Sequence, residues 1–162
     1  MSRRARVITV STRAAAGVYT DTSGPLIHDA LQGLALQVDD VVVVPDGPEL
    51  LTALQAAVTD AVDLVITTGG TGHSPTDLTP EYTRQVIERE SPGIAEAVRA
   101  YGVSRGIATA ALSRGIAGIA GRTLIVNLPG SNGGARDGIA ALTPILGHAL
   151  EQLQGSDHVR TD

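Results

Sequence analysis

The sequence contains no cysteine and no lysine, and these two absences exclude several kinds of chemistry. Without cysteine the chain forms no disulfides, thiolate nucleophiles, zinc–thiolate sites or iron–sulfur clusters. Without lysine it has neither Schiff-base catalysis nor a phosphate-binding loop of the Walker type, whose lysine reaches the terminal phosphates. All twelve residues of the Lys and Arg class are therefore arginines.

Aromatic residues are scarce as well, and the net charge is negative. The chain has no Phe or Trp and only three tyrosines, too few to stack the bases of a single-stranded nucleic acid. A net charge of -5 also disfavours general nucleic-acid binding. No apolar run has the length of a signal peptide or a membrane span. We therefore expect a cytoplasmic protein with neither nucleic acid nor membrane as a partner.

The length of 162 residues suits one domain with a substantial core. We expect a flexible N-terminal arm over residues 1–5, a single domain over residues 6–154 and a flexible polar tail over residues 155–162.

Within that domain, strand-like and helix-like segments alternate. Strands are expected at residues 6–10, 41–44 and 64–66, and the unbroken valines of the second are typical of a strand covered on both faces. Residues 115–128 form two short strands joined by a tight turn. The alternation predicts an α/β fold of three layers (α/β/α). Its sheet is mostly parallel, with helices on both faces and a short antiparallel hairpin near residues 115–128.

The most informative stretch follows the strand at residues 64–66. Its sequence is Thr68-Gly69-Gly70-Thr71-Gly72, and the glycines permit positive φ and close approach of a ligand to the backbone. Asp77 comes five residues after the last of these glycines. An anionic ligand fits such a loop, with Asp77 facing the ligand or its metal ion.

A helix over residues 79–89 is expected to begin directly after this loop. Thr79 is a typical helix cap, Pro80 is tolerated at the first helical position, and Glu81 favours the positive end of the helix dipole. An earlier helix is expected to begin with a similar cap at Thr22.

Polar loops follow the ends of the expected strands. They comprise residues 11–13, Asp46, residues 67–77 and residues 127–134. Because the carboxyl ends of parallel strands line one crevice, these loops predict a single ligand site. Ser11, Thr12 and Arg13 are then candidate contacts, with ordinary turn chemistry as the alternative. For Asp46 the alternative is capping of the next helix.

The residues available at this crevice favour metal-assisted phosphoryl or nucleotidyl transfer. Two carboxylates beside a phosphate site, here Asp46 and Asp77, are typical ligands of Mg²⁺. The four histidines are scattered without the spacing of a zinc motif, and His73 is expected to be a neutral surface residue. Four arginines could neutralise substrate charge or form surface ion pairs, namely Arg13, Arg105, Arg114 and Arg136.

Read together, the glycine loop, Asp77 and the Thr79-Pro80-Glu81 run resemble the signature of the molybdopterin-binding family, which includes the MogA and MoaB proteins and the G domain of gephyrin. The resemblance covers residues 5–153. It includes, in order, Val10-Ser11-Thr12-Arg13, Pro45-Asp46, Leu112-Ser113-Arg114 and Asn127-Leu128-Pro129-Gly130-Ser131.

This resemblance implies a homotrimer that acts in molybdenum cofactor biosynthesis. The implied reaction joins molybdopterin to the adenylyl group of Mg²⁺-ATP, giving adenylyl-molybdopterin and pyrophosphate, and a downstream molybdenum insertase would be a partner. Asp46 and Asp77 would be the catalytic residues and Mg²⁺ ligands. The implied substrate- and nucleotide-binding residues are Ser11, Arg13, Thr68, Gly69, Gly70, Thr71, Gly72, Thr79, Glu81, Pro129, Gly130 and Ser131. The N–H groups of Gly69 to Gly72 would hold anionic oxygens.

The sequence departs from the family pattern at two places. Thr12 stands where many members have aspartate, and Asn132-Gly133-Gly134 replaces the usual continuation after the Leu-Pro-Gly-Ser run. Two further functions stay open at this point. One is a catalytically silent molybdopterin-binding or scaffolding protein of the MoaB type, and the other is a generic nucleotide-binding regulatory domain.

Overall fold

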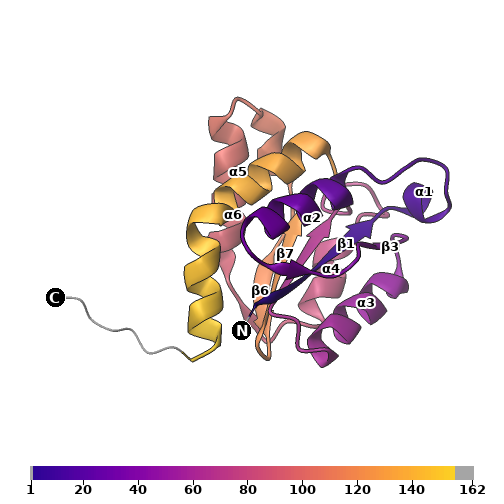
Figure 1. Ribbon diagram of the computed structural model, residues 1–162. Helices are drawn as coiled ribbons and strands as arrows, with labels where there is room; N and C mark the ends of the chain where they lie inside the picture. Colours follow the sequence, from indigo (N-terminus) through magenta and orange to yellow (C-terminus); the bar gives the residue numbers. More distant parts are fainter. Residues whose placement is uncertain (1, 156–162) are drawn as a thin grey trace.

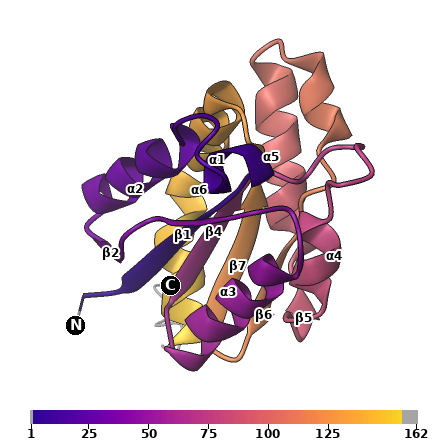
Figure 2. The same ribbon diagram turned by 90° about the vertical axis from the view of Figure 1, so that its right-hand side faces the viewer.

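Residues 2–155 are described by the computed structural model, and within them seven strands form one sheet with helices on both faces (Figures 1 and 2). The strands are β1 (Arg4–Val10), β2 (Gln37–Val38), β3 (Val42–Val44), β4 (Leu64–Thr68), β5 (Arg89–Glu90), β6 (Ala117–Ala120) and β7 (Thr123–Leu128). Their order is β2-β1-β4-β7-β6-β5, with β3 also paired to β1. β5 and β6 are antiparallel to their neighbours and the other pairs are parallel, which confirms the predicted fold class.

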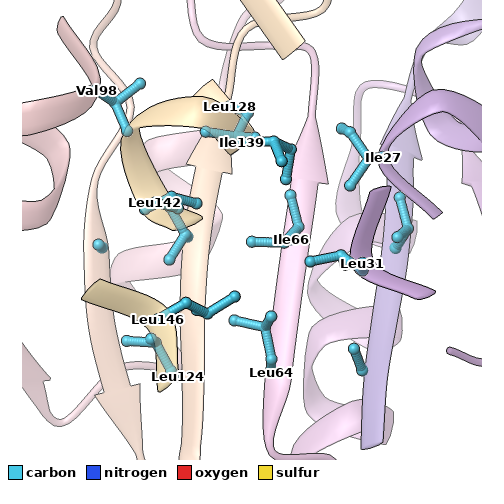
Figure 3. Close-up of a cluster of buried hydrophobic side chains, with 14 of the residues drawn as sticks. Ile27, Leu31, Leu64, Ile66, Val98, Leu124, Leu128, Ile139, Leu142 and Leu146 are labelled. Carbon is cyan, nitrogen blue, oxygen red and sulfur yellow. The ribbon is translucent and has the colours of Figure 1, made fainter. Parts of the chain in front are cut away.

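The helices are α1 (Thr12–Ala15), α2 (Ser23–Gly33), α3 (Pro48–Thr59), α4 (Thr79–Arg84), α5 (Pro92–Ser104), the 3₁₀ helix η1 (Ala108–Leu112) and α6 (Asn132–Leu153). α2, α5 and α6 cover one face of the sheet, whereas α3 and α4 cover the other. Figure 3 shows the first core, where Ile27 and Leu31 of α2 and Leu142 of α6 converge on Ile66 of β4. All five residues of β4 are buried, because β4 lies in the centre of the sheet with helices above and below.

The first strand begins earlier than expected. β1 starts at Arg4, whose backbone N–H donates to Asp63 Oδ2 at 2.8 Å. The side chain of Arg6 donates to Asp39 Oδ2 at 2.8 Å, so these arginines are held at the sheet by carboxylates. Two residues of the expected arm, Arg4 and Ala5, therefore belong to the sheet. The expected tail over residues 155–162 lies outside the described residues except for Gly155.

The valine strand is not covered on both faces. β3 pairs only with β1 among the described strands, and Val43 is 37% exposed. The strand lies at the edge of the sheet, so the prediction of burial on both faces, made from its unbroken apolar run, is wrong.

The helix expected over residues 79–89 is shorter, because α4 ends at Arg84. The backbone N–H of Glu88 donates to Ile119 O at 2.8 Å, and that of Ser91 donates to Ala117 O at 2.8 Å. Backbone groups between these residues thus pair with β6 and form β5. With only Val86 and Ile87 as large apolar side chains after Arg84, sheet pairing prevails over continued helix.

The two threonines expected as helix caps make other bonds. Thr22 precedes α2 without a capping bond and donates from Oγ1 to Asn132 Oδ1 at 3.0 Å. Asp21 Oδ1 instead accepts from the N–H of Gly24 in the first turn of α2. Thr79 donates from Oγ1 to Gly69 O at 2.9 Å, which ties α4 to the glycine loop.

Candidate functional site

The four polar loops predicted from the sequence meet at one end of the sheet. β1, β3, β4 and β7 run parallel, so their carboxyl ends lie together and their loops line a common pocket of about 390 Å³. We call it the carboxylate pocket. Its lining includes Ser11, Thr12, Arg13, Tyr19, Asp21, Asp46, Thr68, Gly70, Asp77 and Gly130. The expected convergence of the loops is confirmed.

Asp46 is held by the loop after β1 and does not cap α3. Its Oδ2 accepts from Thr12 Oγ1 at 3.0 Å and from the Thr12 N–H at 3.3 Å. The cap position of α3 is Gly47, where no side chain accepts a capping bond. Within residues 2–155, no group donates to Asp46 Oδ1, so this oxygen is available to a ligand.

Asp77 closes the loop after β4 in a similar way. Its Oδ2 accepts from the N–H of Ser74 at 3.1 Å, and its Oδ1 accepts no hydrogen bond from a described residue. Both half-buried aspartates thus offer one oxygen each to the same pocket. This donor set suits Mg²⁺, a cation that prefers oxygen ligands and usually shares them with water and phosphate. No described group of three or more acidic or histidine residues forms a complete metal site, so phosphate or water would have to supply the remaining ligands.

Glycine is required in the loop because it passes close to other backbone and side chains. Gly69 has φ +102°, and a Cβ there would lie 2.3 Å from Val10 O. Gly70 has φ +65°, and its Cβ would lie 2.2 Å from Thr79 Oγ1 and 3.1 Å from Asp46 Oδ1. The expectation for the Gly69 N–H is wrong, because this group donates to Leu128 O at 3.1 Å and is not available to an anion.

Arg114 holds the outer part of the loop. Its backbone N–H donates to Thr71 O and its Nε to Gly72 O, each at 2.8 Å. Its guanidinium also donates to the carbonyl of Asp77 and to the carboxylate of Glu81. The hydrogen bond between them lowers the pKa of Glu81 and raises that of Arg114, against the opposing effect of burial on each. These bonds give Arg114 and Glu81 a positioning role.

Neither Arg114 nor Glu81 lines the carboxylate pocket or the second pocket described next. Thr79 lines neither pocket either, and its hydroxyl acts on the loop through Gly69. Arg114, Glu81 and Thr79 were expected to contact the ligand or to neutralise its charge. They instead support the glycine loop from outside both pockets.

A second pocket, of about 590 Å³, lies on the other side of the glycine loop. We call it the apolar pocket because α5 and η1 supply mostly apolar side chains to its wall. Its lining includes Thr71, Gly72, His73, Val98, Arg99, Gly102, Ile107, Ala110, Leu112, Ser113, Pro129, Ser131, Gly133, Gly134 and Asp137. The two pockets divide the expected site residues, since Gly70 and Gly130 line one while Gly72 and Ser131 line the other.

The wall between the pockets is thin. A Cβ on Gly130 would lie 3.0 Å from the Cα of Gly69, so the loops after β4 and β7 pack directly against each other. A ligand spanning both pockets would therefore cross the two glycine loops together.

Sequence reasoning missed several lining residues. Tyr19 lies within 2.8 Å of Ser11 Oγ through its hydroxyl, and its ring centre is 5.5 Å from Arg13 Cζ. Asp21 accepts from Thr9 Oγ1 at 2.8 Å. Both lie in the loop after β1, and that location was the signal that could have identified them. His73, expected at the surface, is exposed and also borders the apolar pocket.

Comparison with known proteins gives a consistent result. The sequence model described as "Probable molybdopterin binding domain" matches residues 6–148. The chain is 35% identical to "Molybdopterin adenylyltransferase" of Helicobacter pylori J99 over 154 residues, covering 93% of this chain and 87% of the relative. It is 50% identical to the solved molybdopterin biosynthesis Mog protein of Mycobacterium ulcerans, with a TM-score of 0.89 and coverage of 94% and 99%.

Some relatives are much longer. The "Molybdenum cofactor biosynthesis bifunctional protein" of Synechococcus elongatus is 41% identical over 155 residues, which are 95% of this chain and 48% of the relative. The chain spans about half the length of such bifunctional relatives.

Proposed function

The chain belongs to the molybdopterin-binding family of molybdenum cofactor biosynthesis proteins, and we propose that it transfers the adenylyl group of Mg²⁺-ATP to molybdopterin. The observation that carries this proposal is the pair of pockets on either side of one glycine loop. The carboxylate pocket contains Asp46 and Asp77, and each has one carboxylate oxygen that accepts no hydrogen bond from a described residue. The adjoining apolar pocket has mainly apolar walls. Two adjoining pockets of different character suit a reaction that joins two substrates.

The nucleotide phosphates occupy the carboxylate pocket in this proposal. Asp46 and Asp77 would hold Mg²⁺, and Arg13 neutralises phosphate charge. Ser11, Thr68, Gly70 and Gly130 supply polar groups and close backbone approach at the same pocket. When bound, the metal ion polarises the phosphate oxygens and stabilises charge on the leaving group.

Molybdopterin occupies the apolar pocket, with its phosphate turned toward the loops that separate the two pockets. The walls from α5 and η1 suit the planar pterin, since ligand sites for flat heterocycles are largely apolar with few polar groups. Thr71, Gly72, Pro129 and Ser131 lie on the side of this pocket nearest the glycine loops, where the phosphate would lie.

The reaction is an in-line displacement at phosphorus. An oxygen of the molybdopterin phosphate attacks the α-phosphorus of ATP and forms a P–O–P bond. The bond from the α-phosphorus to the bridging oxygen of the β-phosphate breaks, and its electron pair leaves with pyrophosphate. A phosphate monoester, with a second pKa of about 6, is already ionised at pH 7. The reaction therefore needs positioning and charge stabilisation more than a strong base, which agrees with a chain lacking Lys and Cys.

We also propose a cytoplasmic homotrimer that passes its product to a molybdenum insertase. No helix among the described residues is long and apolar enough to cross a membrane. The bifunctional relatives support a second step carried out next to the first, because about half of each relative lies outside the part that this chain matches. Light scattering measures the molar mass of the purified protein in solution. A homotrimer should give three times the mass of one chain.

Incubation of the protein with molybdopterin, ATP and Mg²⁺ tests the proposed reaction. We expect adenylyl-molybdopterin, identified by mass spectrometry, together with an equal amount of pyrophosphate. Tight molybdopterin binding without product would contradict the enzyme and identify the silent MoaB-type binder. Nucleotide binding without any affinity for molybdopterin would identify a regulatory nucleotide-binding domain.

A further inference from the structure

Asp137 presents an unpaired carboxylate to a pocket whose other walls are mainly apolar. It lies in the second turn of α6, is half-buried and lines the apolar pocket. No described residue donates a hydrogen bond to it or forms an ion pair with it. Arg99, a cationic residue in the same pocket wall, donates from Nη1 to the carbonyls of Ser113 and Gly115.

The fold itself does not use this carboxylate. The start of α6 is capped by Ser131, whose Oγ accepts from the N–H of Gly134 at 3.0 Å. Asp137 lies one turn beyond that cap, past the N–H groups that lack partners within the helix. A half-buried carboxylate without a partner is unfavourable for stability, so a ligand is the natural source of the missing donors.

The backbone that carries Asp137 is closely packed. A Cβ on Gly138 would lie 2.6 Å from the side chain of Leu128, and one on Gly134 would lie 2.7 Å from Pro129 Cβ. The first turns of α6 therefore pack closely on β7 and on the loop that follows it. This packing fixes the position of the backbone from which Asp137 projects, and selective recognition depends on such support.

We propose that Asp137 recognises the pterin ring of the substrate by accepting two hydrogen bonds from its amidine edge, formed by the 2-amino group and the neighbouring ring N–H. This inference rests on the proposed function and adds a residue that selects the heterocycle. A carboxylate has two acceptor oxygens and pairs side by side with two parallel donors. The apolar residues Val98, Ile107 and Leu112 would flank the ring while Asp137 reads its edge.

The sign of a charge-removal experiment separates this role from a general electrostatic effect. Molybdopterin carries a negative phosphate, so a carboxylate that only lies nearby repels it. Asp137→Asn would then bind molybdopterin more tightly. If Asp137 accepts two bonds from the pterin, the same substitution weakens binding about 10- to 100-fold, the usual size for hydrogen bonds to a charged group.

Equilibrium dialysis under anaerobic conditions gives the dissociation constant for molybdopterin in the wild type, in Asp137→Asn and in Asp29→Asn. Asp29 is a matched control because its side chain is 80% exposed on α2 and lines neither pocket. We expect weaker binding for Asp137→Asn alone, with an unfolding midpoint that is unchanged or raised. Unchanged or tighter binding by Asp137→Asn, or weaker binding together with a lowered midpoint, would overturn the assignment.

Competition by simple heterocycles tests the edge itself. Pterin has a 2-amino group, whereas lumazine has an oxygen at the same position. Pterin should displace molybdopterin from the wild type at lower concentration than lumazine does, and Asp137→Asn should lose that preference. Equal competition by both compounds in the wild type, including none by either, would contradict the assignment. Wild-type protein that does not bind molybdopterin at all would instead refute the proposed function, on which this inference depends.

Discussion

Thr12 and Asp46 are joined by hydrogen bonds in both directions. Thr12 Oγ1 accepts from the backbone N–H of Asp46 at 3.1 Å and donates to its Oδ2 at 3.0 Å. The Thr12 N–H adds a third bond to Oδ2 at 3.3 Å. Thr12 therefore orients Asp46 without adding negative charge. It leaves Oδ1 of Asp46 without a donor among the described residues, so this oxygen is open to the proposed Mg²⁺.

Thr12→Val tests this orienting role. Valine keeps the shape of threonine but loses both hydroxyl bonds, so Asp46 should be less well placed and turnover should fall about tenfold or more. Molybdopterin affinity should stay unchanged, because Thr12 lines only the carboxylate pocket. Thr20→Val is the control, since Thr20 lies in the same loop without a partner among the described residues. Full turnover by Thr12→Val would show that Asp46 does not need this bond.

Gly70→Ala should disrupt the glycine loop. An alanine at φ +65° costs about 1–2 kcal/mol, and its Cβ would collide with Thr79 Oγ1. We expect lower stability in urea unfolding together with loss of turnover. Gly147→Ala is the matched control in α6, where a Cβ meets nothing within 4 Å. That change should stabilise the protein by about 0.5–1 kcal/mol and leave turnover intact. Equal stability of the two variants would contradict the strain assigned to Gly70.

The Arg114–Glu81 pair makes part of the stability depend on pH. The hydrogen bond from Arg114 lowers the pKa of Glu81 from its ordinary 4.5 in the folded state. Its contribution is therefore present above pH 4.5 and is lost as the pH falls through the lowered value. Both side chains are over one-third exposed, so the contribution should be about 1 kcal/mol or less.

Glu81→Gln removes the charge of this pair. The variant should be slightly less stable than the wild type at pH 7, and the difference should shrink when urea unfolding is repeated below pH 4.5, as the wild-type carboxylate is protonated. A stability difference that stays constant over this range would show that Glu81 does not act through its charge.

The sequence predicts the fold class and the meeting of the loops well, because both follow from strand periodicity and from parallel pairing. It does less well where tertiary partners decide local structure. Thr79 is a residue type typical of helix caps, yet its hydroxyl donates to Gly69 O across the loop. A helix was expected over residues 79–89, yet α4 ends at Arg84, and Arg89 at the end of this run pairs with β6 as part of β5.

The same limit applies at the site. The loop at residues 67–77 and Asp46 were identifiable from their positions after strands. The division of the glycine loops between two pockets was not, because it depends on how η1 packs on α5 and how α5 packs on α6. Asp137 was equally hidden, since a single acid on a helix has no pattern until its surroundings are known.

We infer that Asp77 serves adenylyl transfer and not molybdopterin binding. The most direct measurement compares the wild type with Asp77→Asn for two quantities, the molybdopterin dissociation constant and the rate of pyrophosphate release with saturating molybdopterin and Mg²⁺-ATP. We expect measurable release by the wild type, a loss of at least about 100-fold in Asp77→Asn, and nearly equal molybdopterin affinity in the two proteins. Pyrophosphate release by Asp77→Asn at the wild-type rate would contradict this inference.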